Sequence, residues 1–286
     1  MLIHRSLTTI RCRNHLLDLS VPVVMGVINV TPDSFYEPSR TSPGDSQIVD
    51  IAGKMLESGA AILDIGGMSS RPGSMPVEVN EEEDRVVSVI DLLMAHFPAA
   101  IISVDTYRAQ VAKSSILAGA SIVNDISGGS LDPALWDVVR SHQVAYCLMH
   151  MKGTPADMQS RTEYQDLISD LLKYFVNKLT ELHRLGIRDI MIDPGFGFAK
   201  TMEQNYHIIQ HLDLFRILGC PVMVGVSRKS TLSKTINRPA EETLSATTAL
   251  HMAALQKGAS ILRAHDVIPA MDAIAVYVKL RDQQIH

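Results

Sequence analysis

Eight short apolar runs, each ending in polar residues, are distributed along the whole chain. The runs are continuous and rich in β-branched residues, without the alternation of a half-exposed strand. Such runs are typical of strands that are buried on both faces of a parallel sheet. They occupy residues 23–30, 60–67, 100–106, 121–127, 144–151, 190–197, 221–228 and 259–266.

Helical periodicity occupies the segments between these runs. Apolar residues three or four positions apart form one stripe over 48–56 and another over 86–97. The second stripe follows four acidic residues at 81–84, which suit the N-terminus of a helix. A recurring Gly-Ala pair, at Gly59, Gly119 and Gly258, is expected to end a helix and turn the chain into the next strand.

Eight strands alternating with helices predict a single (β/α)8 TIM barrel, a fold of about 250 residues that fits this 286-residue chain. A doubly wound open sheet is the alternative, because each unit alone fits both folds, but the count of eight favours the barrel. No stretch resembles a linker, so we predict one domain over 1–286. Residues 1–22 would be a lead-in and 23–286 the barrel.

The lead-in has three arginines and no acidic residue among its first seventeen residues, a faint feature of transit peptides. Its apolar residues follow no helical order, which favours a short strand or hairpin.

Composition narrows the functional classes. A chain with 46% hydrophobic and 20% charged residues is neither disordered nor a coiled coil. Its net charge of −5 argues against a nucleic-acid partner, and its apolar runs are too short to span a membrane. Three widely separated cysteines suit a reducing compartment, so a cytoplasmic protein is expected.

Polar residues gather where the predicted strands end. The carboxyl ends of barrel strands converge on the active site, although each such residue alone is also a common helix cap. Together they predict a site for a small polar molecule. The residues are Asn29, Asp64, Asp105, Asn124, Asp125, His150, Asp193, Ser227, Arg228, Lys229, Arg263 and His265.

These side chains fall into chemical groups. Asp105, Asn124 and Asp193 suit a flat heterocycle rich in hydrogen-bond donors. Phe196 and Phe198, in a glycine-rich turn expected to be exposed, suggest a wall for ring stacking. Cations that suit a phosphate or carboxylate are Arg71, Lys229, Arg263 and His265. Hard oxygen ligands for Mg²⁺, shared with a substrate phosphate, are Asn29 and Asp33.

Seven segments together resemble dihydropteroate synthases, the folate-pathway barrel enzymes that join a pterin diphosphate to p-aminobenzoate. No segment is decisive alone, but they occur in order at the expected strand ends. They are residues 26–35 (GVINVTPDSF), 104–106 (VDT), 124–126 (NDI), 149–151 (MHM), 193–198 (DPGFGF), 227–230 (SRKS) and 263–266 (RAHD).

The resemblance implies a role for each matching residue. Catalytic residues would be Asp105, Lys229, Arg263 and His265. The pterin would contact Asp105, Asn124, Met149, Asp193 and Lys229. The diphosphate would contact Asn29, Ser70, Arg263 and His265, with Asn29 also holding Mg²⁺. p-Aminobenzoate would contact Phe35, Arg71, Pro72, Phe198 and Ser230.

The implied reaction is a Mg²⁺-assisted dissociative substitution. 6-Hydroxymethyl-7,8-dihydropterin diphosphate and p-aminobenzoate would give 7,8-dihydropteroate and diphosphate. Mg²⁺, Arg263 and His265 would neutralise the leaving group, and Asp105 would stabilise positive charge on the pterin. The attacking arylamine needs no nucleophilic side chain, and a structural hydrogen bond is the favoured role of His150. The resemblance also implies a homodimer.

The chain departs from the family's usual sequence near the expected p-aminobenzoate site. Met68 stands where the family usually has a glutamate, and Ser70 stands where it has a threonine. Residues 36–40 replace a short Asp-Gly-Gly turn, and Ala199 stands where glycine is common. Sulfonamide drugs imitate p-aminobenzoate. One hypothesis is therefore a sulfonamide-insensitive, resistance-type enzyme, and the other is neutral drift in a housekeeping enzyme.

Two other functions are compatible with a pterin pocket. One is a methyl-tetrahydrofolate-binding barrel of a corrinoid methyltransferase system, which would not need the cations of 227–230 and 263–265. The other is a homologue that binds pterin without catalysis, which only Met68 supports.

Overall fold

Eight parallel strands form the centre of the protein in the computed structural model, which describes residues 8–30, 43–68 and 77–283. Each of the eight apolar runs contains one of these strands, which confirms that prediction. They are β3 (Val23–Asn29), β4 (Ala60–Gly66), β5 (Ile101–Asp105), β6 (Ile122–Asp125), β7 (Ala145–Met149), β8 (Ile190–Asp193), β9 (Met223–Val224) and β10 (Ile261–Ala264).

The sheet curls into a nearly closed barrel. Hydrogen-bonded neighbours run in the order β8-β7-β6-β5-β4-β3-β10-β9, so the last strand of the chain pairs with β3. Between β8 and β9 the contact is a single bridge, Ile192 to Val222, with the Ile192 N–H donating to the Pro221 carbonyl at 2.9 Å. The predicted (β/α)8 barrel is therefore correct and the open sheet is not.

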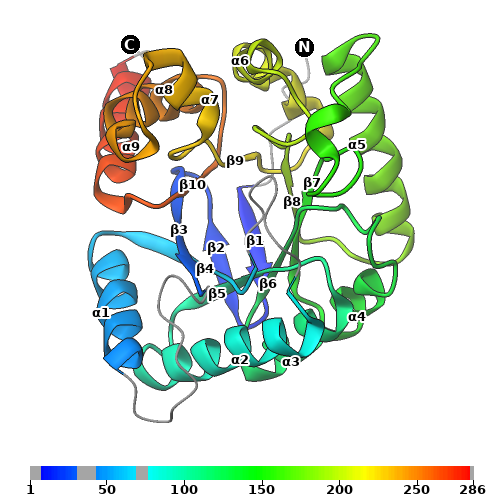
Figure 1. Ribbon diagram of the computed structural model, residues 1–286, viewed down its shortest axis with the longest axis vertical. Coiled ribbons are helices and arrows are strands. Elements are labelled where there is room, and N and C mark those ends of the chain that lie inside the picture. The colour runs from blue at the N-terminus through cyan, green and yellow to red at the C-terminus, as the bar shows by residue number, and fades with distance from the viewer. Residues whose placement is uncertain (1–7, 31–42, 69–76, 284–286) are drawn as a thin grey trace.

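Helices surround the strands, as Figure 1 shows. The two predicted stripes fall in α1 and α2, and Gly59, Gly119 and Gly258 have positive φ angles where helices end. No helix within the described ranges is long and apolar enough to cross a membrane. The helices are α1 (Pro43–Glu57), α2 (Val79–His96), α3 (Ala109–Ala118), α4 (Leu135–His142), α5 (Leu167–Arg184), α6 (Met202–Gln210), α7 (Ser230–Ile236), α8 (Leu244–Gln256) and α9 (Val267–Asp282), with 3₁₀ turns η1 (Met158–Ser160), η2 (Leu212–Leu218) and η3 (Ala240–Glu242).

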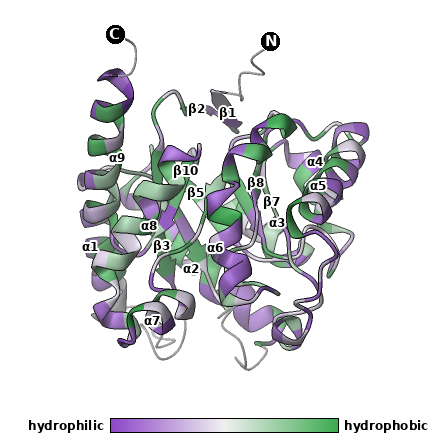
Figure 2. Ribbon diagram, turned by 90° about the horizontal axis from the view of Figure 1, so that it is seen from above, coloured by the Kyte–Doolittle hydropathy of each residue, from purple (hydrophilic) through white to green (hydrophobic). Residues whose placement is uncertain are grey.

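A hairpin packs on one end of the barrel, and Figure 2 shows its two strands at the top of the view. Its strands, β1 (Thr9–Cys12) and β2 (His15–Asp18), confirm the hairpin expected in the lead-in. It packs against residues near the starts of the barrel strands, among them Met25, Ile62 and Ile122. The amino end is therefore filled with apolar side chains, which leaves the carboxyl end for chemistry.

The hairpin allows a matched test of this packing. Leu17 is 6% exposed and Leu16 is 70% exposed, so the same substitution at the two positions isolates burial. We expect Leu17→Ala to lower the free energy of unfolding by about 2–5 kcal/mol. Leu16→Ala should change it by less than about 0.5 kcal/mol. Urea denaturation followed by circular dichroism measures both, and equal losses would contradict the packing described.

Candidate active site

One cavity, open to solvent, lies at the carboxyl end of the barrel. Residues at or just after six successive strands converge on it, as expected where parallel strands end together. Seven of the residues predicted from the sequence are among those that line it. The lining residues are Asp105, Asn124, Ile126, Met149, Asp193, Phe198, Gly225, Lys229 and Arg263.

Arg263 crosses one side of this cavity between two carboxylates. Its Nε donates to Asp64 Oδ2 at 2.7 Å and an Nη to Asp105 Oδ2 at 2.6 Å, and Asn124 Nδ2 donates to the same Asp64 oxygen at 3.0 Å. Burial disfavours the charged guanidinium, but Asp64 and Asp105 outweigh it and raise the pKa of Arg263. Asp64, for which no role was predicted from the sequence, is fully buried. It holds the side chain of Arg263, the residue predicted to bind the diphosphate.

The same environment favours the charged form of Arg263 but disfavours the charged form of Asp105. Burial raises the pKa of Asp105 to about 7, although the Arg263 charge acts to lower it. The remaining oxygen of Asp64, Oδ1, is buried and has no hydrogen-bond partner among the described residues. This wall of the cavity thus combines one cation with two carboxylates that depend on it.

Lys229 and Asp193 form the charged part of the opposite wall. Burial lowers the pKa of Lys229 to about 8, and Asp193 opposes this effect. Burial raises the pKa of Asp193, which Lys229 opposes, and Asp193 Oδ1 accepts the Gly195 N–H at 2.7 Å. The Lys229 Nζ donates to the Phe196 carbonyl and lies 4.6 Å from the centre of the Phe198 ring. Polar and aromatic groups therefore face one another across a small space.

The turn after β8 differs from its prediction. Phe196 is 2% exposed and packs in the apolar core, and Phe198 is 9% exposed and lines the cavity. The expectation of two rings in an exposed turn was therefore wrong, because this segment folds inward and only Phe198 faces the cavity. Gly195 has a φ of 75°, and a Cβ there would lie 2.0 Å from the His150 carbonyl oxygen. Ala199 has a φ of 51°, a left-handed conformation that suits the glycine common in the family.

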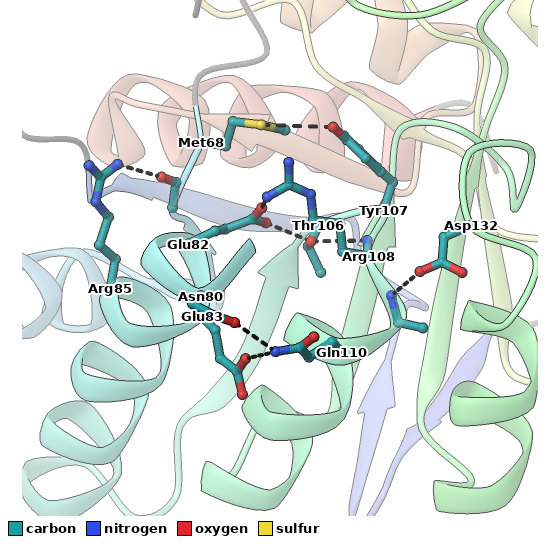
Figure 3. A network of polar contacts seen from close by, with 12 residues as sticks. Met68, Asn80, Glu82, Glu83, Arg85, Thr106, Tyr107, Arg108, Gln110 and Asp132 are labelled. Carbon is teal, nitrogen blue, oxygen red and sulfur yellow. Dashed lines mark hydrogen bonds and ion pairs between the residues drawn. The ribbon is translucent and has the colours of Figure 1, made fainter. Parts of the chain in front are cut away.

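A buried polar network supports β4 and β5 (Figure 3). Glu82, in the first turns of α2, is fully buried and accepts Thr106 Oγ1 at 2.7 Å and Arg108 Nη1 at 2.8 Å. Burial raises the pKa of Glu82, and these two partners oppose the shift. Arg85, one turn further along α2, donates to the Gly67 carbonyl at 3.2 Å. The network fixes α2 against residues that directly follow β4 and β5, next to Asp105.

Asn29, His265 and Ser230 are described by the structure but are not among the residues that line the cavity. Asn29 ends β3, and its Oδ1 lies beside Gly66, as does the Asp105 carboxylate. His265 Nδ1 lies 3.1 Å from Ser227 Oγ, and Ser230 is exposed at the start of α7. Outside the described residues are Asp33, Phe35, residues 36–40, Ser70, Arg71 and Pro72.

Lys200 is a buried residue that the sequence interpretation missed. It is 3% exposed, and its Nζ donates to two loop carbonyls and lies 3.2 Å from His150 Nδ1. His150 therefore has the structural contact favoured for it. A lysine is rarely fully buried, so only its position directly after the glycine-aromatic turn could have drawn attention to it.

Comparisons with known proteins place this fold and cavity in a family. Residues 25–265 match the pterin binding enzymes. The dihydropteroate synthase of Escherichia coli K12 is 38% identical over 262 residues, covering 91% of this chain and 92% of that protein. This chain belongs to the dihydropteroate synthase family.

Solved structures of the family agree with the fold. The Yersinia pestis synthase, in a sulfonamide drug complex, has a TM-score of 0.89 and 36% identity, covering 96% of this chain and 99% of that one. The Xanthomonas albilineans synthase with 4-aminobenzoic acid has a TM-score of 0.88 and 35% identity, covering 97% and 99%. The Xanthomonas albilineans synthase with 7,8-dihydropteroate has a TM-score of 0.84 and 33% identity, covering 96% of this chain and 98% of that one. The resemblance found in the sequence is thus confirmed, and the chain is a transferase.

Burial of Lys229 predicts a pH effect on stability. Its pKa is about 8 in the folded protein against an ordinary value of 10.5, so between these values the unfolded chain binds more protons. Stability contributed at this position therefore rises with pH through that window. We expect wild type to gain free energy of unfolding relative to Lys229→Met as pH increases from about 8 to 10.5. Urea denaturation at several pH values measures this, and a constant difference would contradict the burial described.

Proposed function

We propose that this dihydropteroate synthase works by dissociative substitution at the pterin methylene. The observation that carries the proposal is the cavity in which Asp105, Asn124, Asp193 and Lys229 surround a space bordered by Arg263. Hydrogen-bonding groups for a heterocycle and a cation for a diphosphate thus lie within one site. The Xanthomonas albilineans relative carries 4-aminobenzoic acid in one structure and 7,8-dihydropteroate in another, which are a substrate and the product of the proposed reaction.

The pterin would occupy the cavity itself. Asp193 and Asp105 accept hydrogen bonds from its amino and ring N–H groups, Asn124 and Lys229 donate to its acceptors, and Met149 packs on the ring. Because Asp105 lies buried close to the ring, its carboxylate stabilises the positive charge that spreads into the pterin as the bond to diphosphate breaks.

The diphosphate would lie at the rim, where Arg263 and His265 neutralise its charge, with Ser70 as a further ligand. Arg263 moves from the carboxylates to the diphosphate as the substrate binds. Asp105 then loses its cationic partner where positive charge develops on the pterin. Ground-state binding of the diphosphate is thereby coupled to stabilisation of the transition state.

A magnesium ion fits this rim if the substrate shares in holding it. Asn29 Oδ1 is a hard oxygen near the Asp105 carboxylate, and no group of three or more histidines, cysteines or carboxylates that could hold a metal occurs in the described part of the chain. Asn29 would hold the ion together with diphosphate and water oxygens. When bound, Mg²⁺ would neutralise charge on the departing diphosphate.

p-Aminobenzoate would lie beside Phe198, which is positioned at the cavity, and Ser230, with Phe35, Arg71 and Pro72 as further contacts. Its amino group attacks the pterin methylene, so the site needs only to orient the ring and bind its carboxylate.

Release of diphosphate from pterin diphosphate and p-aminobenzoate tests the function. Lys229→Ala and Asp105→Ala should each lower kcat/KM by a factor of about 10² or more, because each removes a group placed against developing charge. Lys234→Ala and Asp91→Ala, at exposed positions, are matched controls that should keep full activity. Folded wild type without diphosphate release would contradict the synthase and leave a pterin-binding module. Loss of the circular dichroism spectrum in the two site variants would make those residues structural instead.

We also propose that the enzyme is insensitive to sulfonamides. Met68 is the second residue after β4, and its Sδ accepts a weak hydrogen bond from Tyr107 Oη at 3.9 Å. A thioether there removes the negative charge that the family's glutamate carries beside the expected p-aminobenzoate site.

Inhibition by a sulfonamide, measured beside the KM for p-aminobenzoate, tests this idea. We expect the ratio of drug inhibition constant to KM to exceed that of the Escherichia coli enzyme by about tenfold or more. Met68→Glu should lower the ratio, and Leu117→Glu, at a position on α3 that is 68% exposed, is a control for the added charge. A ratio equal to that of the Escherichia coli enzyme would support neutral drift.

The proposed enzyme is a homodimer and is located in the cytoplasm. Apolar side chains are exposed on α8 and α9, which favours a homodimer through this face: Leu244, Ile268, Val276 and Leu280. Cys12, Cys147 and Cys220 are free and buried, in keeping with a cytoplasmic enzyme of one domain.

A further inference from the structure

The turn between β8 and α6 is held by an unusual set of side-chain hydrogen bonds. Each of its five consecutive carbonyls, from residue 195 to residue 199, accepts one. Because the donors come from several separate segments, the turn is fixed from more than one side. The pairs are Lys200 to Gly195 at 3.0 Å, Lys229 to Phe196, Gln159 to Gly197 at 3.1 Å, Lys200 to Phe198 at 2.9 Å and Tyr164 to Ala199 at 2.9 Å.

Lys200 is the only one of these donors that binds two of the carbonyls. They belong to the first and last residues of the β-turn at 195–198, which is itself closed by the Phe198 N–H donating to the Gly195 carbonyl at 3.1 Å. An ammonium has three N–H donors, and the third points to His150 Nδ1 at 3.2 Å. The buried amine thus has three partners, two of which are carbonyls of the turn.

This arrangement has an energetic implication. Burial lowers the pKa of Lys200 to about 7, so enclosing the amine is unfavourable. An apolar side chain of similar length would fill the same space without that desolvation. What the amine contributes is therefore its hydrogen bonds, and its removal would leave two buried carbonyls without their side-chain donor.

The hydrogen bonds of Lys200 support the part of the cavity that Phe198 lines. Phe198, whose carbonyl Lys200 binds, lines the cavity on the side proposed for p-aminobenzoate. Asp193, on the pterin side, ends β8 and is held by the pairing of β8 with β7, where it is opposite Met149, and its hydrogen bond to the turn is the one from the Gly195 N–H. Loosening the turn should move the ring more than the carboxylate.

We infer that Lys200, backed by His150, is a positioning residue that fixes the Phe198 ring for p-aminobenzoate. The inference rests on the proposed function, because it takes p-aminobenzoate as the ligand of Phe198. The amine itself touches no substrate. It acts through the turn by setting where the ring stands against the arylamine.

Lys200→Met tests the inference, since it keeps the length of the side chain and removes the donors. Diphosphate release gives kcat and both KM values. We expect the KM for p-aminobenzoate to rise about tenfold, with the KM for the pterin diphosphate and kcat changing by less than about threefold. Lys200→Gln, which retains a donor, should be intermediate and provides the same comparison if the methionine variant does not fold. Lys173→Met, on the exposed face of α5, is the matched control.

A double-mutant cycle separates positioning from a merely structural role. If Lys200 acts through Phe198, Lys200→Met should have little further effect on the p-aminobenzoate KM of Phe198→Ala. Additive effects, an equal rise of both KM values, or lower stability with unchanged KM values would overturn the inference. Failure of wild type to release diphosphate would instead overturn the proposed function, so the two failures are distinguishable.

Discussion

The carboxyl end of this barrel depends on the position of one guanidinium. Arg263 lies between Asp64 and Asp105 with both contacts shorter than 2.8 Å, and all three side chains are largely or fully buried. Removing one member of such a group leaves an uncompensated charge in a poorly solvated place, which is strongly unfavourable. In the proposed reaction, the cation that binds the diphosphate is thus the one that compensates Asp64 and Asp105 before substrate binds.

Two further buried charged groups hold the walls of this site from behind. Glu82 joins α2 to Thr106 and Arg108, which follow β5, and Lys200 closes the turn after β8. Each has its charged end in hydrogen bonds to protein groups rather than in the cavity. Buried polar networks of this kind are stable only when their donors and acceptors are satisfied, and they then restrict the structure to one arrangement. Hydrogen bonds of this kind therefore back the walls that carry the proposed pterin and p-aminobenzoate contacts.

Much of this arrangement follows from the sequence, and the limits have a physical cause. Parallel strands that end together bring Asp105, Asn124 and Asp193 to one place whatever the loops do, so counting strand ends was enough to find them. Phe196 and Lys200 could not be placed in this way. Both follow a strand in a turn whose direction is set by tertiary contacts, and one turned into the core against expectation. Asp64 was found as a strand end, but its pairing with Arg263, 199 residues away in the chain, appears only in the folded barrel.

In the proposed mechanism, substrate binding transfers Arg263 from the two carboxylates to the diphosphate and leaves Asp105 to the pterin. A crystal structure with a non-reactive pterin diphosphate analogue and Mg²⁺ tests this transfer. We expect the guanidinium within hydrogen-bond distance of diphosphate oxygens and no longer on Asp105, whose carboxylate faces the pterin ring in the cavity. Arg263 still bound to Asp64 and Asp105, with the diphosphate held elsewhere, would contradict it.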